Sequence, residues 1–315
     1  MGFMQPKDKL FGRDVSRNEK ISIPVGASRK DRFLAVEQMH LLYDSWEKRS
    51  LPIPIYKEGK TDNAPYAVKS QSDLERVYQS LRLFLAQYLC CGCNLMDLAT
   101  LKYDSFYFEN EGKAFRFIRQ KTADTAHDGE GTEVIVPITA ELKEIIRSTN
   151  EEPIANQLVF PCILGKDVHA DAIRQKDVIK QQNHNIGDHM KKIAASFGWN
   201  EAVSSTYARH SFATNLFTQG VPKDYISDAM GHTIANRGDI TSRYISPYTI
   251  EKRLQYNSLL LAVNGKVEDT KKERTYTDTG KQDLLAMLGD YSIEDLKSAV
   301  IMLQGKKIDK MQNNK

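Results

Sequence analysis

The sequence contains no long hydrophobic run. Among its 315 residues there is no stretch of eighteen apolar residues, which is about the length that a membrane-spanning helix requires. The opening residues, MGFMQPKDKLFGRD, also lack the apolar core of a signal peptide. We therefore expect a cytoplasmic protein with no membrane partner.

Cysteine is also scarce. The four cysteines are Cys90, Cys91, Cys93 and Cys162, and three of them are crowded into one hydrophobic, helix-like stretch. No spacing of Cys and His matches a zinc site, and the crowding excludes a disulfide framework, so we expect buried thiols in a reducing compartment. The sequence also lacks a GxxxxGK[ST] loop and a carboxylate cluster, and so gives no sign of a nucleotide or metal cofactor.

The sequence has little excess of either charge. The chain has 44 Lys and Arg against 41 Asp and Glu, a net charge of +3, which is too small to indicate nucleic-acid binding by itself. Any basic surface would have to come from local clustering. The hydrophobic fraction of 41% and the charged fraction of 27% are typical of a globular protein that can bury a core.

Hydrophobic periodicity divides the chain into four parts. Residues 1–32 carry eight basic and four acidic side chains without sustained periodicity, which predicts an exposed basic arm or linker. Residues 33–263 form the main domain. Residues 264–281 are polar and predict a flexible tether, and residues 282–315 predict a small helical hairpin.

Helices dominate the main domain. A long apolar helix is expected from about Asp73 to Cys91, with Ser72 as its N-cap. Further helices are expected at 140–149 and 183–197.

The expected β-structure is confined to one region of the main domain. Residues 103–122 predict a β-hairpin that turns at Glu109–Gly112, and a third strand follows at 133–139. The expected fold class is therefore mainly α with a small antiparallel β-sheet (α+β).

The stretch 204–248, SSTYARHSFATNLFTQGVPKDYISDAMGHTIANRGDITSRYISPY, combines three groups suited to phosphate chemistry. Arg209 lies in an amphipathic helix pattern, and a guanidinium can bind two phosphate oxygens at once. His232 follows a glycine at the end of a second helix pattern, and Tyr244 lies twelve residues further on. Taken singly, these residues could be a solvated charge, a helix cap and an interface aromatic. A phenol has a pKa of about 10 and needs neighbours to act as a nucleophile.

The order RHSFAT, MGH and SRY resembles the tyrosine recombinase family of phage- and mobile-element-type integrases. The resemblance covers roughly residues 30–262 and is strongest in 204–246. It implies the tyrosine recombinase catalytic domain fold, in which Arg209 grips the scissile phosphate and His232 hydrogen-bonds a phosphate oxygen. It also implies that Tyr244 is the nucleophile, with Tyr248 as a nearby alternative, and that Lys121 protonates the leaving 5′ oxygen.

Two positions depart from the pattern of this family. The first box of the family has an arginine where this chain has Asn94, in CGCNLMDL, although Asp97 keeps the supporting acidic residue. The histidine of the second box is Thr206, which can donate a hydrogen bond but cannot carry charge.

Arg119 is a candidate substitute for the missing cation. Residues i and i+2 of a strand point to one face, so Arg119 and Lys121 are expected to project together toward the site. The alternative is that Arg119 is a cross-strand charge partner on the exposed face of the strand.

The resemblance implies a site-specific recombinase that cuts and rejoins DNA through a 3′-phosphotyrosine. Such a reaction needs no metal, ATP, other cofactor or small-molecule substrate. The implied partner is double-stranded DNA in the bacterial cytoplasm, bound by a homotetramer. Family members pass a C-terminal helix to a neighbouring subunit, and the hairpin of residues 282–304 either plays that part or folds back on its own subunit. The N-terminal DNA-clamping domain of the family is either removed or naturally absent, with residues 1–32 as its possible remnant.

Two other functions remain open at this stage. The loss of the first-box arginine is also consistent with a catalytically weakened DNA-binding relative that regulates a partner recombinase. A type IB topoisomerase shares the tyrosine chemistry, although its boxes match this chain less well.

Overall fold

The computed structural model describes six ranges of the chain: 32–56, 64–119, 132–149, 152–199, 202–232 and 248–263. The chain divides into two compact units, Met1–Lys266 and Val267–Lys315, and every described residue belongs to the first unit. Apart from Arg32, the expected basic arm, the tether and the C-terminal hairpin lie outside the described residues.

The described part is mostly helical and contains a two-stranded antiparallel sheet, which agrees with the expected α+β class. The elements, in chain order, are α1 (Val36–Glu47), α2 (Gln71–Leu89), α3 (Leu95–Thr100), α4 (Ser105–Glu109), β1 (Ala114–Ile118), β2 (Glu133–Pro137), α6 (Ala140–Arg147), the 3-10 turns η1 (Pro161–Ile163) and η2 (Gly165–Asp167), α7 (Ala172–Ser196), α8 (Thr206–Thr218), α9 (Lys223–Ala229), α10 (Ile250–Asn257) and the 3-10 turn η4 (Ser258–Leu261).

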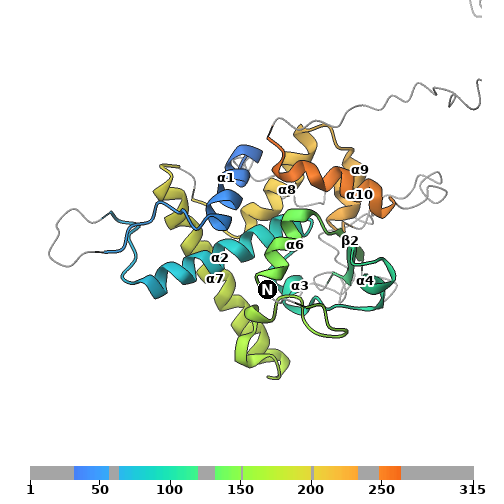
Figure 1. The fold of residues 1–315 in the computed structure, drawn as a ribbon, viewed down its shortest axis with the longest axis horizontal. Helices are drawn as coiled ribbons and strands as arrows, with labels where there is room; N and C mark the ends of the chain where they lie inside the picture. Colours follow the sequence, from blue (N-terminus) through green and yellow to red (C-terminus); the bar gives the residue numbers. More distant parts are fainter. Residues whose placement is uncertain are drawn as a thin grey trace, which may run out of the picture. The chain divides into compact units, whose positions relative to one another are not determined.

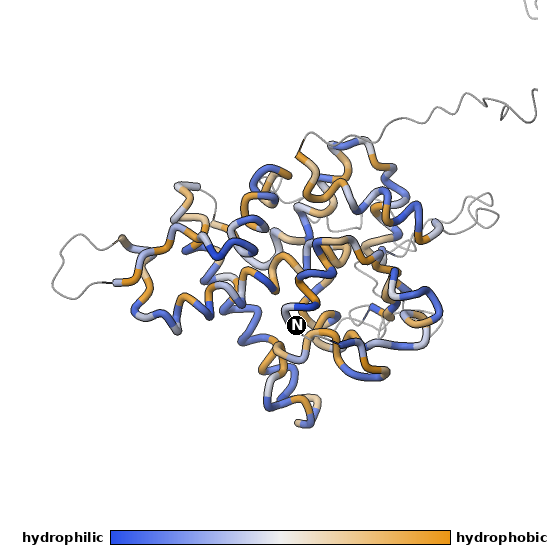
Figure 2. Tube along the Cα trace, viewed as in Figure 1, coloured by the Kyte–Doolittle hydropathy of each residue, from blue (hydrophilic) through white to orange (hydrophobic). Residues whose placement is uncertain are grey.

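Helix α2 lies at the centre of the core. It packs against α1, α6, α7 and α8 (Figure 1), and almost every residue from Val77 to Leu89 is buried. Figure 2 shows hydrophobic residues recurring along this helix. The helix begins two residues earlier than expected, because the hydroxyl of Ser70 rather than Ser72 accepts the backbone N–H of Asp73 at 3.1 Å.

The sheet pairs different segments from those expected. β1 and β2 pair antiparallel from Ala114 opposite Pro137 to Ile118 opposite Glu133, so the two strands of the sheet are the second and third of the three expected. Phe115 is fully buried in the core, while Arg116, on the opposite face of the strand, is half-buried.

The expected hairpin within 103–122 is wrong, because its first strand is the short helix α4. The carboxylate of Asp104 accepts the backbone N–H of Tyr107 at 3.1 Å and so caps the first turn. The Tyr107 ring then stacks on Phe115 of β1 with a centroid distance of 5.1 Å. Gly112, with φ of +70°, lets the chain turn closely around the Tyr107 ring.

Helix α7 is longer than its hydrophobic pattern indicated. The expected helix at 183–197 extends back to Ala172, because Asp171 caps it by accepting the backbone N–H of Arg174 at 2.9 Å. The added N-terminal turns are largely exposed, and for this reason they lack the hydrophobic period that marks the packed half.

A buried polar network fixes helix α8 against the core. The Asn215 side chain donates to the Tyr88 hydroxyl at 2.9 Å and to the Leu34 carbonyl at 3.1 Å. The Tyr88 hydroxyl in turn donates to the Leu260 carbonyl at 2.6 Å, and the backbone N–H of Leu34 donates to the Ser211 hydroxyl at 2.9 Å. Segments far apart in the sequence are therefore tied to the helix that carries Arg209.

The cysteines are only partly as expected. Cys90, Cys91 and Cys93 are buried free thiols, but Cys162 is exposed, which corrects the expectation for that residue. None of the helices in the described ranges combines the length and hydrophobicity that a membrane span requires.

Candidate active site

The site begins at the turn that ends helix α2. Cys91 and Gly92 both have positive φ, +57° and +63°, so the chain reverses sharply here. A Cβ on Gly92 would lie 3.0 Å from the Cα of Arg209, so α8 crosses the turn at a distance that only glycine permits. The Gly92 carbonyl accepts a hydrogen bond from Nη1 of Arg209 at 2.8 Å. The turn at Cys91 and Gly92 therefore contacts Arg209 through its backbone.

The MGH sequence is the C-terminal cap of α9. The backbone N–H of His232 bonds the Ser227 carbonyl at 3.0 Å, and that of Gly231 bonds the Asp228 carbonyl at 2.9 Å, which is the Schellman pattern. Gly231 takes the left-handed φ of +61° that this cap requires. Because His232 follows the cap directly, backbone geometry sets the position from which its imidazole leaves the helix.

Arg209 joins these two turns. Its Nη2 donates to the Met230 carbonyl at 3.0 Å and contacts Nε2 of His232 at 2.9 Å. A guanidinium has donors only, so Nε2 must be the acceptor and the neutral ring carries its proton on Nδ1. Of the five N–H groups of Arg209, two have no partner among the described residues, which leaves them for a ligand.

The electrostatics agree with this arrangement. Burial lowers the pKa of His232, and the charges of Arg209 and Arg119 lower it further, so the ring is neutral at neutral pH. Burial also lowers the pKa of the Arg209 guanidinium, followed by the charge of Arg119, while Asp97 acts in the opposite sense. The free site thus holds like charges that an anion would stabilise.

Arg119 lies at the end of β1 and points to the same place. Its side chain is 8% exposed and its Nη1 donates to the Gly231 carbonyl at 3.0 Å. A Cβ on Gly231 would lie 3.3 Å from Cδ of Arg119 and 2.6 Å from Cγ2 of Val134, so the cap of α9 packs directly on the sheet. Burial of Arg119 contradicts the alternative that it is a charge partner on the exposed face.

The structure gives the local contacts of Asn94 and Thr206. Asn94 is the N-cap residue of α3, and its backbone N–H donates to the buried carboxylate of Asp97 at 3.3 Å. Thr206 is the first residue of α8 and is exposed, with its hydroxyl 2.9 Å from that of Ser204. It precedes Arg209 by three residues and shares its side of the helix. Neither residue supplies a charge.

Lys121 and Tyr244 lie outside the described residues. Tyr248 is described, and burial raises its pKa, which disfavours the phenolate that a nucleophile needs. Its ring packs edge-on against Tyr225 at a centroid distance of 5.1 Å. These contacts make Tyr248 a packing residue.

Sequence reasoning missed the ion pair of the buried Arg253 with the half-buried Asp228. Arg253 is 3% exposed, and its Nη2 donates to the Asp228 carboxylate at 2.6 Å. Its other nitrogens donate to the Tyr248 carbonyl at 3.0 Å and the Ile135 carbonyl at 3.4 Å. Arg253 thus links α10, α9 and β2 beside the site. No spacing signals it, because arginine in an amphipathic helix is ordinarily solvated.

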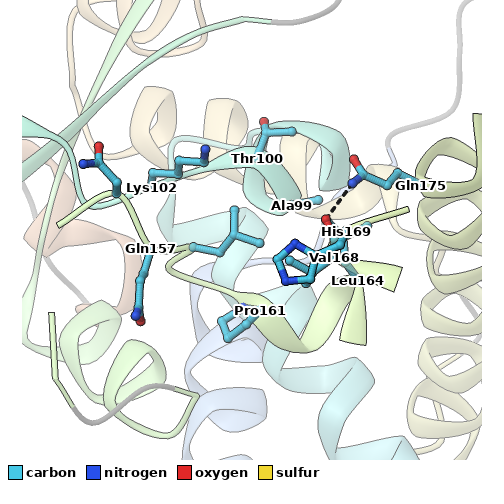
Figure 3. A pocket seen from close by; sticks show the side chains of 11 residues that line it. Ala99, Thr100, Lys102, Gln157, Pro161, Leu164, Val168, His169 and Gln175 are labelled. Carbon is cyan, nitrogen blue, oxygen red and sulfur yellow. Dashed lines mark hydrogen bonds between the residues drawn. The ribbon is translucent and has the colours of Figure 1, made fainter. Parts of the chain in front are cut away.

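Several hollows lie in the described part, and one of them borders the site. An open, mainly apolar groove of about 400 Å³ borders His232 between α8 and α9. A second cavity of about 840 Å³ lies between the end of α3 and the start of α7 (Figure 3). Its lining includes Lys102, His169 and Gln175, and Gln175 donates to the Val168 carbonyl at 2.8 Å. None of the predicted site residues is among those that line this second cavity.

In the part of the chain that the structure describes, no group of three or more His, Cys, Asp or Glu side chains is placed to hold a metal ion.

Known proteins resemble this chain only distantly. No protein-family model matches the sequence, and no curated protein matches it. Among solved structures the chain is similar to one titled "Crystal structure of XerA recombinase", with 14% identity and a TM-score of 0.32, over 84% of this chain and 78% of that chain. A similarity of this size carries no argument about activity.

Proposed function

We propose that the protein cuts and rejoins double-stranded DNA through a covalent 3′-phosphotyrosine formed by Tyr244. The reaction is a transesterification that needs neither ATP nor a metal. Arg209 and His232 bind the scissile phosphate, and Lys121 protonates the leaving oxygen. The roles of Tyr244 and Lys121 rest on the resemblance of the sequence to tyrosine recombinases.

The observation that supports this proposal most is the meeting of Arg209 and His232 at the capped end of α9. Nη2 of Arg209 lies 2.9 Å from Nε2 of His232, so both side chains can reach one ligand. Partial burial and the nearby charge of Arg119 both destabilise the charged form of Arg209. A bound phosphate would offset this free-energy cost, so the site favours an anion. Arginine, which presents several N–H groups in a fixed plane, suits a phosphate.

The steps of the reaction follow from these groups. The phenol of Tyr244 loses its proton to water and its oxygen bonds to phosphorus, while the bond from phosphorus to the 5′ oxygen breaks. Lys121 gives its proton to that oxygen, which leaves a 5′ hydroxyl. Charge develops on the non-bridging oxygens in the transition state, where Arg209 and His232 stabilise it. The hydroxyl of another strand then reverses the step.

A second function is favoured by one observation. Asn94 is an N-cap residue where the resemblance expects a cation. A protein that had lost catalysis could still bind DNA phosphates and regulate a partner recombinase.

Formation of a covalent adduct distinguishes the two functions. The protein is incubated with nicked DNA duplexes of randomised sequence, and adducts are detected by denaturing electrophoresis. We expect an adduct with the unaltered protein and none with Tyr244→Phe.

The matched control is Tyr248→Phe, which should form the adduct as the unaltered protein does. Absence of any adduct from the unaltered protein, with DNA binding retained, would support the regulatory function. An adduct that persists in Tyr244→Phe but disappears in Tyr248→Phe would show that Tyr248 is the nucleophile.

A further inference from the structure

Two guanidinium groups reach the same turn from different elements. Arg209 comes from α8 and donates to the Met230 carbonyl at 3.0 Å. Arg119 comes from the end of β1 and donates to the next carbonyl, that of Gly231, also at 3.0 Å. The two guanidiniums thus bond consecutive carbonyls of the turn that precedes His232, and they lie near enough for the charge of Arg119 to lower the pKa of Arg209.

We propose that Arg119 supplies the second positive charge of the phosphate site, as a positioning residue that acts through the Gly231 carbonyl and not by gripping the phosphate itself. This inference rests on the proposed function, because it assigns the charge that Asn94 does not provide.

The burial of Arg119 indicates that it positions other groups and does not contact the phosphate directly. Arg119 is 8% exposed and its Nη1 is engaged by Gly231, so reaching a phosphate would require breaking that bond. The side chain also lies close to Gly231, since an added Cβ there would meet Cδ of Arg119 at 3.3 Å. The arginine is therefore held against the backbone of the turn.

The bond from Arg119 serves the helix end as well as the site. The last carbonyls of a helix have no partner within the helix, and a cation near them offsets the negative end of the helix dipole. By binding the Gly231 carbonyl, Arg119 fixes the peptide plane from which His232 projects. Its charge acts on the same point, because it lowers the pKa of both Arg209 and His232.

The charged groups around His232 come from three elements. Arg209 faces it from α8 and Arg119 from the end of β1, and Lys223 of α9 lines the same groove as the ring. All three are cationic. The charges of Arg209 and Arg119 favour the neutral ring in the free protein, and all three attract an anion to it. Removing one charge should therefore change both the titration of His232 and the affinity for phosphate.

The test uses inorganic phosphate and two variants of the full chain. Arg119→Met keeps the length of the side chain but removes charge and donors, and Arg119→Lys keeps the charge. The His232 ring is followed by NMR over a range of pH, with its signal assigned by its loss in His232→Asn. We expect Arg119→Met to bind phosphate about tenfold more weakly or worse, and to raise the pKa of His232. Arg119→Lys should retain most of both properties.

Arg116→Met is the matched control, because Arg116 belongs to the same strand but lies on its exposed side, 3.8 Å from Asp104 and 3.9 Å from Glu133. It should behave as the unaltered protein does. A folded Arg119→Met that binds phosphate and titrates normally would overturn the inference, and so would an equal loss in Arg119→Met and Arg119→Lys.

The phosphate-binding test of Arg119 can fail independently of the adduct test of the proposed function, because phosphate binding does not involve Tyr244. Phosphate binding that depends on Arg119, without any Tyr244 adduct, would contradict the proposed function alone. An unaltered protein whose His232 signal does not respond to phosphate would contradict both.

Discussion

Arg209 and Arg253 show two ways of burying an arginine in one domain. Arg253 is 3% exposed, and its charge meets the Asp228 carboxylate at 2.6 Å as well as two carbonyls. Arg209 is partly buried, and among the described residues its bonds go to two carbonyls and a neutral imidazole, never to a carboxylate. A buried arginine whose charge is neutralised makes the fold sensitive to loss of its partner, whereas an arginine held only by neutral acceptors can still bind an anion.

The largest effect should come from unpairing Arg253. Asp228→Ala leaves the buried guanidinium without its carboxylate, and breaking a buried ion pair in this way costs about 3–5 kcal/mol. We expect the lower end of that range, because water reaches Asp228. Urea denaturation measures the loss. Asp224→Ala, on the exposed side of the same helix, is the control and should change stability by less than about 0.5 kcal/mol.

Arg209→Met should give the opposite result. We expect adduct formation to slow by about 100- to 1000-fold, as when a transition-state donor is lost. Stability should fall less than in Asp228→Ala, because removing a partly buried charge offsets part of the cost of leaving the Gly92 and Met230 carbonyls without a donor. Single-turnover kinetics and denaturation of the same variant test both halves. A stability loss equal to that of Asp228→Ala would refute the distinction between the two arginines.

A neutral buried network should have an intermediate effect. Tyr88→Phe removes the hydroxyl that donates to Leu260 and accepts from Asn215, so a carbonyl and an N–H lose their partner. Each such loss costs about 1–3 kcal/mol, and thermal denaturation measures it. Tyr56→Phe, at a side chain that is 48% exposed, is the control. Equal melting temperatures for the two variants would show that the network does not stabilise α8.

The smallest effect concerns pH. His232 has a lowered pKa in the folded protein, from burial and then from Arg209 and Arg119, so the unfolded chain binds its proton more readily. Stability should therefore fall as the pH decreases from neutral through the ordinary pKa of histidine toward the folded value. His232→Asn should lose this component, which appears as a smaller drop in stability between pH 7.5 and 5.5. An unchanged drop would mean that other groups cause it.

The sequence allowed the helical class and the order of the charged groups to be predicted, because both depend on local pattern. Helical periodicity located α2 and α8, and the structure places Arg209 and His232 in contact. Local capping chemistry caused the errors. Asp104 caps a short helix in an aromatic-rich segment whose residues favour a strand. Asp171 caps α7 at the start of an exposed stretch that has no hydrophobic period.

Contacts between distant segments could not be predicted. The pairing of Arg253 with Asp228 depends on how α10 lies against α9, and nothing near either residue encodes that approach. The bond from Arg119 to Gly231 likewise depends on the packing of Val134 against the cap. The alternation of β1 indicated only which face Arg119 would take.

Because β1 pairs with β2, an inserted residue would have a different effect on the direction of Arg119 inside the strand than in the connection that follows it. The ladder runs from Ala114 opposite Pro137 to Ile118 opposite Glu133, and continues with the backbone N–H of Arg119 bonded to the Thr132 carbonyl at 3.0 Å. One residue added within 114–118 would turn Arg119 to the other face and put Ile118 toward the α9 cap, with no change in composition. A residue added in the connection between 119 and 132 would leave that face unchanged. Length variation should therefore be tolerated in the connection after Lys121 and strongly selected against inside the strand.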